Sequence, residues 1–314
     1  GTLSGITAGL GNFAEINLPL QAYKVLLGND TITGSNLGDT LFTGDGGTDT
    51  VDAKGGNDFI GIAATGFAPF HSINGGTGTD TIEAISNHFS ADKVLDLRNT
   101  TLESIEALTI EGGLTVRLLG SQIGAGVSSG ASVAKTLGSG DGSLEVVLDA
   151  PGAANLSGFT VGAGVSIKIF GSTGADTITG SRIGETISGD AGADVIRGGL
   201  GPDTMFGGAG GDRFDFDAVT EIGKKKGALD LISDWGAGDR IDLSTIDANG
   251  TKKGDKAFKF LKKEGADFTK AGQVSFDQKK GNTFVQGDTN GDGKADFKLL
   301  IVGEIDLTKG DFVL

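Results

Sequence analysis

The sequence contains no cysteine, four prolines and a single methionine, Met205, among 314 residues. The absence of cysteine excludes disulfide bonds and thiol chemistry. No apolar run approaches the ~18 residues of a membrane span, and no basic start followed by an apolar stretch marks a cleaved signal peptide. Because Met205 is the only methionine, Gly1 is a processed or engineered start, and we expect the chain to be a piece of a longer protein.

Histidine is also scarce, which bears on catalysis. His71 and His88 lie 17 residues apart without the H-E-x-x-H pattern of a zinc protease. Residues 126–130 read GVSSG, like the G-x-S-x-G of a hydrolase nucleophile, but no histidine follows His88 to act as the base. No set of nucleophile, base and orienting group emerges. We expect no enzyme activity here; a catalytic domain, if there is one, would precede residue 1.

Glycine, in contrast, is abundant, with 57 of 314 residues, or about 18% against a norm near 7%. With 37% apolar residues and little proline, this composition favours ordered, turn-rich β structure over disorder. The net charge is −15, from 26 basic and 41 acidic residues. Self-repulsion would oppose folding until cations neutralise it, so we expect a cation-dependent fold and no nucleic-acid partner.

A nine-residue unit repeats five times without interruption between residues 171 and 215. The units read GSTGADTIT, GSRIGETIS, GDAGADVIR, GGLGPDTMF and GGAGGDRFD. The sixth position is acidic in each unit: Asp176, Glu185, Asp194, Asp203 and Asp212. The eighth position is apolar in each unit: Ile178, Ile187, Ile196, Met205 and Phe214. The leading glycines permit tight turns, and the last three residues form a strand whose central side chain faces a core.

Two units make one coil of 18 residues, which alternates turn, strand, turn and strand. Acids 18 residues apart then stack about 4.8 Å from one another, with Asp176, Asp194 and Asp212 on one edge and Glu185 and Asp203 on the other. Such rows repel unless a cation lies between them, and a hard ion with six or more oxygen ligands, Ca²⁺, fits best. We therefore expect several calcium ions, bound by these acids and by the leading glycines Gly171, Gly189, Gly198 and Gly207.

The unit resembles the repeats-in-toxin (RTX) nonapeptide, G-G-x-G-x-D-x-U-x, and residues 198–206 fit every position. The resemblance implies a calcium-binding parallel β-roll. Glu185 departs from the pattern, and its longer side chain predicts the weakest of the five sites. The alternative, a glycine-rich turn array that carries acids by coincidence, is disfavoured by the unbroken period.

A less regular block spans residues 27–83, after an N-terminal cap or opening rung at residues 1–26. Its acids Asp30, Asp39, Asp49 and Asp58 are spaced by 9, 10 and 9 residues, and the unit GGTGTDTIE at residues 75–83 adds Asp80. We expect all five to be calcium ligands. The 22 residues from Asp58 to Asp80 exceed one coil by four, which predicts a bulged loop.

Residues 84–170 lack the calcium motif but keep short apolar runs separated by Gly, Ser and Asn. We expect them to form metal-free rungs of a wider parallel β-helix that joins the blocks at 27–83 and 171–217. The segment DLRNTTLESIEALTI at residues 96–110 is similar to spacer rungs of RTX and bacterial surface-layer proteins. A small separate sandwich domain is the alternative.

Residues 218–314 resemble the C-terminal domain of serralysin-type metalloproteases and of other proteins exported by type I systems. The resemblance lies in DLISDWGAGDRIDLSTIDA, AGQVSFD and TFVQGDTNGDGKADFKLLIVGEIDLTKGDFVL. It implies a cap of antiparallel strands and a secretion signal that includes the terminal DFVL, which can also be a strand of the cap. The predicted fold is thus all-β: a parallel β-roll or β-helix with two calcium-binding blocks, metal-free rungs between them and antiparallel strands at the C-terminus.

Residues 288–296, DTNGDGKAD, match the first nine positions of an EF-hand loop. Asp288, Asn290 and Asp292 would supply side-chain oxygens to calcium, and Asp296 another through water. Position twelve is Leu299 where a glutamate belongs, and an ordinary hairpin fits the flanking strands equally well. A further calcium site and a metal-free turn both stay open.

These features predict a non-catalytic, secreted calcium-binding protein, extracellular or on the cell surface, that folds on extracellular calcium after type I export and has a structural or adhesive role. The partners would be calcium and the type I secretion machinery. The alternative is the C-terminal secretion and folding module of an extracellular enzyme. A carbohydrate-binding module would need more aromatics than Trp235 and Tyr23. Residues 221–280, with 13 basic and 10 acidic residues, form a solvated loop region or contact an anionic cell-surface polysaccharide.

Overall fold

The computed structural model describes residues 29–43, 47–63, 71–85, 93–136, 140–224, 229–249 and 256–314. The segment 1–26, His88 and the bulged loop predicted before Asp80 fall largely or wholly outside the described residues. Backbone contacts divide the chain into two units. Unit 1 comprises residues 1–145 and 158–166, and unit 2 comprises residues 146–157 and 167–314. The five segment boundaries expected from the sequence stay predictions.

Unit 1 is built from short parallel strands. They are β1 (Thr31–Thr33), β2 (Thr40–Phe42), β3 (Thr50–Asp52), β4 (Phe59–Ala63), β5 (Ser72–Asn74), β6 (Thr81–Ile85), β7 (Val94–Asp96), β8 (Thr101–Glu103), β9 (Ile105–Ile110), β10 (Thr115–Leu119), β11 (Val127–Lys135) and β14 (Thr160–Val161), with a 3-10 turn η2 (Gly120–Gln122). One sheet has the order β1-β3-β5-β8 and another has the order β14-β11-β9-β6-β4-β2. Strands β12 (Gly142–Val147) and β15 (Val165–Phe170) contain residues of both units.

Consecutive coils of unit 1 stack with apolar residues in register. In one sheet Ile32, Val51, Ile73 and Leu102 pair in turn, and in the other Leu41, Ile60, Ile82, Leu108 and Val133 do so. From Val51 onward the members of the first column are buried. Because alternate side chains of a strand point to opposite faces, a Thr-Ile-Thr strand buries one residue and exposes two. Each coil therefore adds one core residue per sheet.

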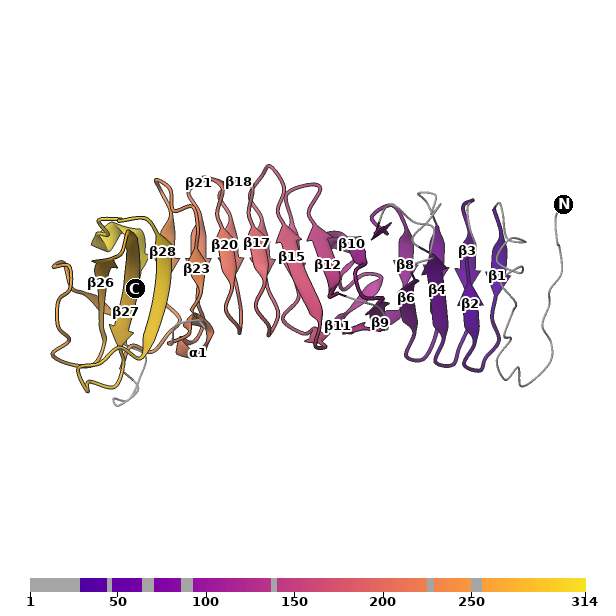
Figure 1. Ribbon diagram of the computed structural model, residues 1–314, viewed down its shortest axis with the longest axis horizontal. Coiled ribbons are helices and arrows are strands. Elements are labelled where there is room, and N and C mark those ends of the chain that lie inside the picture. Colours follow the sequence, from indigo (N-terminus) through magenta and orange to yellow (C-terminus); the bar gives the residue numbers. More distant parts are fainter. Residues whose placement is uncertain are drawn as a thin grey trace. The chain divides into compact units, whose positions relative to one another are not determined.

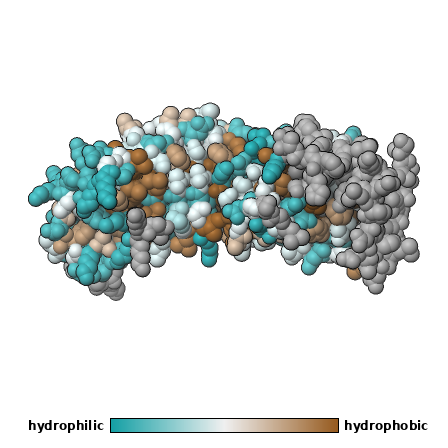
Figure 2. Space-filling view, viewed as in Figure 1, coloured by the Kyte–Doolittle hydropathy of each residue, from teal (hydrophilic) through white to brown (hydrophobic). Residues whose placement is uncertain are grey.

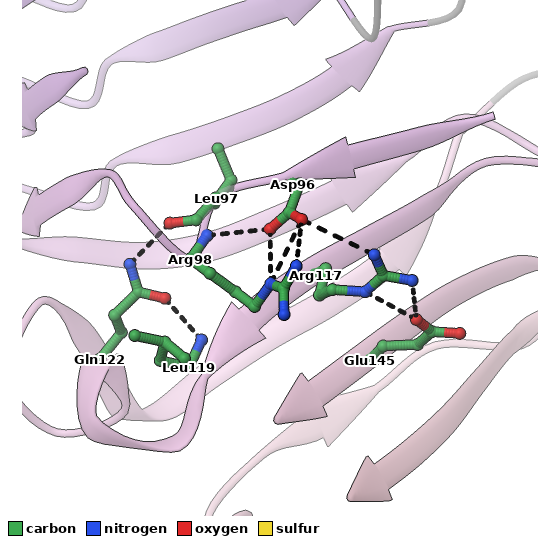
Figure 3. Close-up of polar contacts among 7 residues, drawn as sticks. All are labelled: Asp96, Leu97, Arg98, Arg117, Leu119, Gln122 and Glu145. Carbon is green, nitrogen blue, oxygen red and sulfur yellow. Dashed lines mark hydrogen bonds and ion pairs between the residues drawn. The ribbon is translucent and has the colours of Figure 1, made fainter. Parts of the chain in front are cut away.

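Ion pairs and one buried amide join the coils of unit 1 that lack the acidic repeat (Figure 3). The Arg117 guanidinium, on β10, lies 3.6 Å from Asp96 on β7 and 2.7 Å from Glu145 on β12. The buried side chain of Gln122 donates to the carbonyl oxygen of Leu97, which Figure 3 shows, and also to that of Thr100, at 2.8 Å in both cases. Side chains thus connect neighbouring rungs where no row of acids is present.

Unit 2 contains the regular repeats and the C-terminal strands. Its elements are β13 (Ala153–Asn155), β16 (Thr177–Thr179), β17 (Thr186–Ser188), β18 (Ala191–Gly192), β19 (Val195–Arg197), β20 (Thr204–Phe206), β21 (Ala209–Gly210), β22 (Arg213–Asp215), α1 (Val219–Ile222), β23 (Leu231–Ile232), β24 (Arg240–Asp242), β25 (Lys259–Phe260), β26 (Gln273–Lys279), β27 (Asn282–Asp288), β28 (Phe297–Val302), η3 (Lys309–Asp311) and β29 (Phe312–Val313). Strands β17, β20, β23 and β28 lie side by side (Figure 1).

The 18-residue period appears directly in the pairing of these strands. Ile178 pairs with Ile196, which pairs with Phe214, and on the opposite sheet Ile187 pairs with Met205. All five side chains are fully buried. Two nonapeptides therefore make one coil, and the eighth position of every unit enters the core.

Strand β27 pairs antiparallel with both β26 and β28, and β28 then pairs in parallel with β23. The terminal strand β29 joins the other sheet, where Phe312 pairs with Ile241 of β24. The predicted all-β fold, a parallel roll with antiparallel strands near the C-terminus, is confirmed. In the part of the chain that the structure describes, no helix has the length and apolarity needed to cross a membrane.

Candidate metal-binding turns

Each repeat acid lies at the junction between a turn and a strand, two residues before an apolar side chain that is buried in all units except those of Asp30 and Asp39. Because the side-chain period of a strand is two, the acid faces inward together with that apolar residue. Seven of these acids are no more than 2% exposed: Asp49, Asp58, Asp80, Asp176, Asp194, Asp203 and Asp212. Carboxylates are almost never buried to this extent unless they are paired. The surroundings of each oxygen therefore decide what the turns can bind.

Within each row, one carboxylate oxygen of an acid accepts a backbone hydrogen bond from the acid one coil earlier. The N–H of Asp176 donates to Asp194 Oδ1 at 2.8 Å, and the N–H of Asp194 donates to Asp212 Oδ1 at 2.9 Å. The same bond joins Glu185 to Asp203 at 2.8 Å. In unit 1 it joins Asp30 to Asp49, Asp39 to Asp58 and Asp58 to Asp80. The acids are thus aligned in rows by main-chain donors.

The second oxygen of the same acids is buried and has no hydrogen-bond partner within the described residues. This holds for Oδ2 of Asp30, Asp58, Asp80, Asp194, Asp203 and Asp212, and for Oε2 of Glu185. A buried polar group without a partner costs about 1–3 kcal/mol, and more when it is charged. Rows of such oxygens are the arrangement that bound cations would stabilise.

In the units that hold Asp194 and Asp203, the first glycine leaves open the space beside that oxygen, whereas the unit that holds Asp58 begins with Ala53. A Cβ on Gly189 would lie 2.4 Å from Asp194 Oδ2 and 2.6 Å from the carbonyl oxygen of Gly207. A Cβ on Gly198 would lie 2.2 Å from Asp203 Oδ2. Carboxylate and carbonyl oxygens therefore border the same small space, which any larger residue would fill. Oxygen donors of these two kinds are the ligands that calcium prefers.

Burial raises the pKa of several of these carboxyl groups. The pKa of Asp58, Asp194 and Asp203 rises from 3.8 to about 6, because burial outweighs the stabilising backbone hydrogen bond. Neighbouring acids raise the pKa of Asp58 and Asp194 further. Burial raises the pKa of Asp212 as well. The ionised rows are therefore destabilising when no cation is bound.

In three turns a serine approaches the acid. The N–H of Ser172 donates to Asp176 Oδ2 at 2.6 Å, and its hydroxyl does so at 2.9 Å. Ser35 makes the same two bonds to Asp39 Oδ2, at 2.5 and 3.0 Å. The hydroxyl of Ser181 donates to Glu185 Oε1. The repeats are thus not equivalent, although their sequences share one pattern.

The row that contains Asp30 and Asp49 continues to a histidine. The N–H of Asp49 donates to His71 Nδ1 at 3.1 Å, and both side chains are buried. Burial raises the pKa of Asp49 to about 6. His71 thus occupies the place of an acid one coil after Asp49, which the irregular spacing of this block did not indicate.

Acids beyond the regular repeats extend the rows of unit 2, and the repeat pattern of the sequence did not predict them. Asp203 donates its N–H to Asp230 Oδ1, and Asp212 donates its N–H to Asp239 Oδ1, both at 2.9 Å. Asp230 is fully buried, its Oδ2 lacks a partner, and burial raises its pKa to about 8. Asp230 and Asp239 each lie two residues before an isoleucine, which is the spacing of the repeat acids. The spacing of 27 residues instead of 18, and the missing glycines, hid this pattern.

The loop between β27 and β28 brings Asp288, Asn290 and Asp296 together. Asp288 Oδ1 accepts from the N–H groups of Asn290 and Gly291, and Oδ2 accepts from that of Gly293. Asp296 accepts from Thr289 and Asn290. The Asp292 carboxylate accepts from the N–H of Lys294. The side-chain oxygens thus bond to the loop itself, as in a hairpin turn, and the calcium site proposed for it stays a prediction.

Among the described residues, no three His, Cys, Asp or Glu side chains gather as a metal-binding group. Any cation in the rows would therefore need backbone oxygens as well as carboxylates. A family model described as "Peptidase M10 serralysin C terminal" matches residues 49–314. A model described as "RTX calcium-binding nonapeptide repeat (4 copies)" matches residues 26–60. A search among curated proteins finds no match.

Proposed function

The chain belongs to the Peptidase M10 serralysin C terminal family, and from this we propose that it is a calcium-dependent folding module of a secreted protein, with a structural role and no catalytic activity of its own. The observation that carries the proposal is the set of buried carboxylate oxygens without a partner. These oxygens lie in the rows that the repeat builds, so the family and the geometry support the same ion.

The family matches confirm the predicted resemblance to RTX proteins and to serralysin C-terminal domains. RTX nonapeptide repeats bind calcium, and the two domain types are typical of extracellular proteins secreted by type I systems. The serralysin C-terminal domain is the non-catalytic part of serralysin-like proteases. The ligands and the role of this chain go beyond those statements and belong to the proposal.

Asp194, Asp203 and Asp212 would hold calcium, together with backbone carbonyl oxygens such as that of Gly207. In unit 1 Asp58 and Asp80 would do the same. The bound ion would supply positive charge to rows of buried carboxylates and complete their coordination with oxygen. The open space beside Gly189 and Gly198 supports this assignment, because a Cβ at either position would fill it.

Folding would then be linked to calcium. A net charge of −15 and rows of buried acids oppose folding when no ion is present, and binding free energy becomes folding free energy. Extracellular calcium modules bind with Kd of about 10⁻⁴–10⁻³ M. The chain would therefore stay unfolded at cytosolic calcium during type I export and fold at millimolar calcium outside the cell.

Circular dichroism of the full chain tests this proposal. We expect a large gain of β signal when calcium is added to chelator-treated protein, and a smaller gain with the same concentration of magnesium, which prefers stricter octahedral geometry. Calorimetric titration would give the number of ions. A spectrum that is the same in chelator and in calcium would contradict the proposal.

A second candidate is that the chain is the C-terminal folding and secretion module of an extracellular enzyme. The match of a serralysin C-terminal model over residues 49–314 favours it. The sequence that precedes Gly1 in the full gene product distinguishes the two candidates. A zinc-protease helix or a lipase nucleophile motif there would favour the enzyme, and further repeats would favour a surface protein.

An adhesive role would require a surface that contacts a partner. Figure 2 shows hydrophilic side chains over the C-terminal strands of unit 2, and Lys259, Lys262, Lys263, Lys279 and Lys280 are exposed there. These cations support an anionic cell-surface polysaccharide as the partner. Retention of calcium-loaded protein on an immobilised anionic polysaccharide, with release by salt, would support this role, and no retention at low salt would contradict it.

A further inference from the structure

The turns before the repeat acids adopt two backbone conformations, which differ at the second residue of the unit. In five turns this residue has a positive φ: Lys54 (74°), Gly76 (91°), Asp190 (72°), Gly199 (92°) and Gly208 (93°). In the three other turns whose second residue the structure describes, this residue is a serine, Ser35, Ser172 or Ser181, and φ is not positive. Residue type and conformation therefore vary together.

The state of the acid four residues later follows the same division. After a positive-φ residue the second oxygen of Asp58, Asp80, Asp194, Asp203 and Asp212 has no partner in the described part of the chain. After a serine, Oδ2 of Asp39 or Asp176 accepts from the serine N–H and hydroxyl. Glu185 accepts from the hydroxyl of Ser181 and keeps one oxygen unpartnered. The serine supplies donors where the other turns leave the carboxylate open.

The open conformation is kept even where it is unfavourable. Lys54 and Asp190 are not glycines, and a positive φ is unfavourable for a residue with a side chain. Both nevertheless share the conformation of Gly76, Gly199 and Gly208. Strain of this kind persists where the surrounding structure requires it and often marks functional positions.

The serine turns also share a position. Asp39 precedes Asp58 and Asp80 in one row. Asp176 precedes Asp194 and Asp212 in a second row, and Glu185 precedes Asp203 in a third. Each serine thus stands at the first acidic repeat of its row. Asp176 begins its row: its Oδ1 accepts from the N–H of Gly152, and no acidic repeat precedes Asp176 in that row.

We propose that the second residue of each turn decides whether that turn takes calcium. The positive-φ turns hold the ion, and the serine turns at Asp39, Asp176 and Glu185 are closed by their own serine and take none. The serines thus close the first repeat of each of these three rows. This inference rests on the proposed calcium-dependent folding and specifies which repeats carry it out.

Two matched pairs of variants test the inference in the full chain. Asp190 is exposed, and D190S and D190G both remove its carboxylate, but only serine can donate a hydroxyl to Asp194. We expect D190S to bind one calcium ion fewer than D190G. S172G removes the hydroxyl and permits a positive φ, so we expect it to bind one ion more than the wild type, whereas S172A, which keeps the ordinary φ, gains none.

The readout is the number of bound ions, from calorimetry or from native mass spectrometry after titration with calcium chloride, with folding followed by circular dichroism. Equal ion counts in D190S and D190G, together with no gain in S172G, would overturn the inference while leaving calcium binding intact. A wild-type chain that binds no calcium would instead overturn the proposed function. If S172G does not fold, the D190S and D190G pair still decides the question.

Discussion

The backbone N–H of Asp194 donates a hydrogen bond of 2.9 Å to Oδ1 of Asp212, its counterpart one coil further along the chain. This bond fixes one oxygen of Asp212 and leaves the other buried without a partner. Main-chain donors thus hold like charges in line, although those charges repel one another. The row is stable as a carboxylate row only if something positive meets the remaining oxygens.

Enlarging the first glycine of an open turn is expected to block its site. In G198A the new Cβ would lie 2.2 Å from Asp203 Oδ2 and displace it. We expect one bound calcium fewer, and a smaller rise in melting temperature on adding calcium. G130A is the control, because its Cβ has as its nearest atom the Gly158 carbonyl oxygen at 4.0 Å. An unchanged ion count in G198A would argue against this geometry.

Neutralising one repeat acid should change the free energy of unfolding in opposite directions with and without calcium. Burial makes the ionised form of Asp194 unfavourable in the calcium-free fold, so D194N is expected to be as stable as the wild type, or more stable, in chelator. In calcium it should be less stable by about 1–3 kcal/mol, the cost of a lost charged partner. Urea unfolding measures both values. The control is D141N, which replaces an exposed acid and should change neither free energy of unfolding by more than about 0.5 kcal/mol.

The raised pKa values predict a pH dependence whose sign reverses with calcium. Asp58, Asp194 and Asp203 have a pKa of about 6 in the fold against 3.8 ordinarily. The calcium-free fold therefore binds protons more tightly than the unfolded chain. The contribution of these three carboxyl groups to its stability is complete below pH 3.8 and is lost as the pH rises through 6. Calcium-free protein should gain β signal in circular dichroism as the pH falls from 7.5 to 5.

Calcium affinity should fall over the same interval, because protons and calcium compete for the same oxygens. Titrations at pH 7.5 and pH 5 measure this change. A calcium affinity that is independent of pH would contradict the assignment of these three acids as ligands.

The C-terminal strand is expected to stabilise the fold of unit 2. Phe312 pairs with Ile241, its ring lies 5.0 Å from that of Phe260, and it is 7% exposed. Burial of this kind predicts that F312A lowers the free energy of unfolding by about 3 kcal/mol. V302A, at a side chain that is 45% exposed, should have little effect. Equal losses in urea unfolding would show that β29 contributes no specific packing.

The sequence alone was sufficient for the periodic part of the fold. An acid at position six and an apolar residue at position eight, repeated every nine residues, predicted that Ile178 stacks on Ile196 and that Asp176 lies in a row with Asp194. This works because side-chain direction in a strand depends only on the parity of the position, and every coil makes contact with its neighbours alone. The identity of the calcium ligands stays a prediction.

Only the tertiary structure decided how the rows begin and end. Ser172 and Gly199 occupy the same position of the repeat, yet only Gly199 has a positive φ, and only Ser172 donates to the acid four residues later. Asp230 and His71 enter rows that no constant spacing connects to them, and Phe312 joins β24 across 71 residues of chain. Periodicity records contacts between successive units, whereas these contacts depend on where irregular segments return in space.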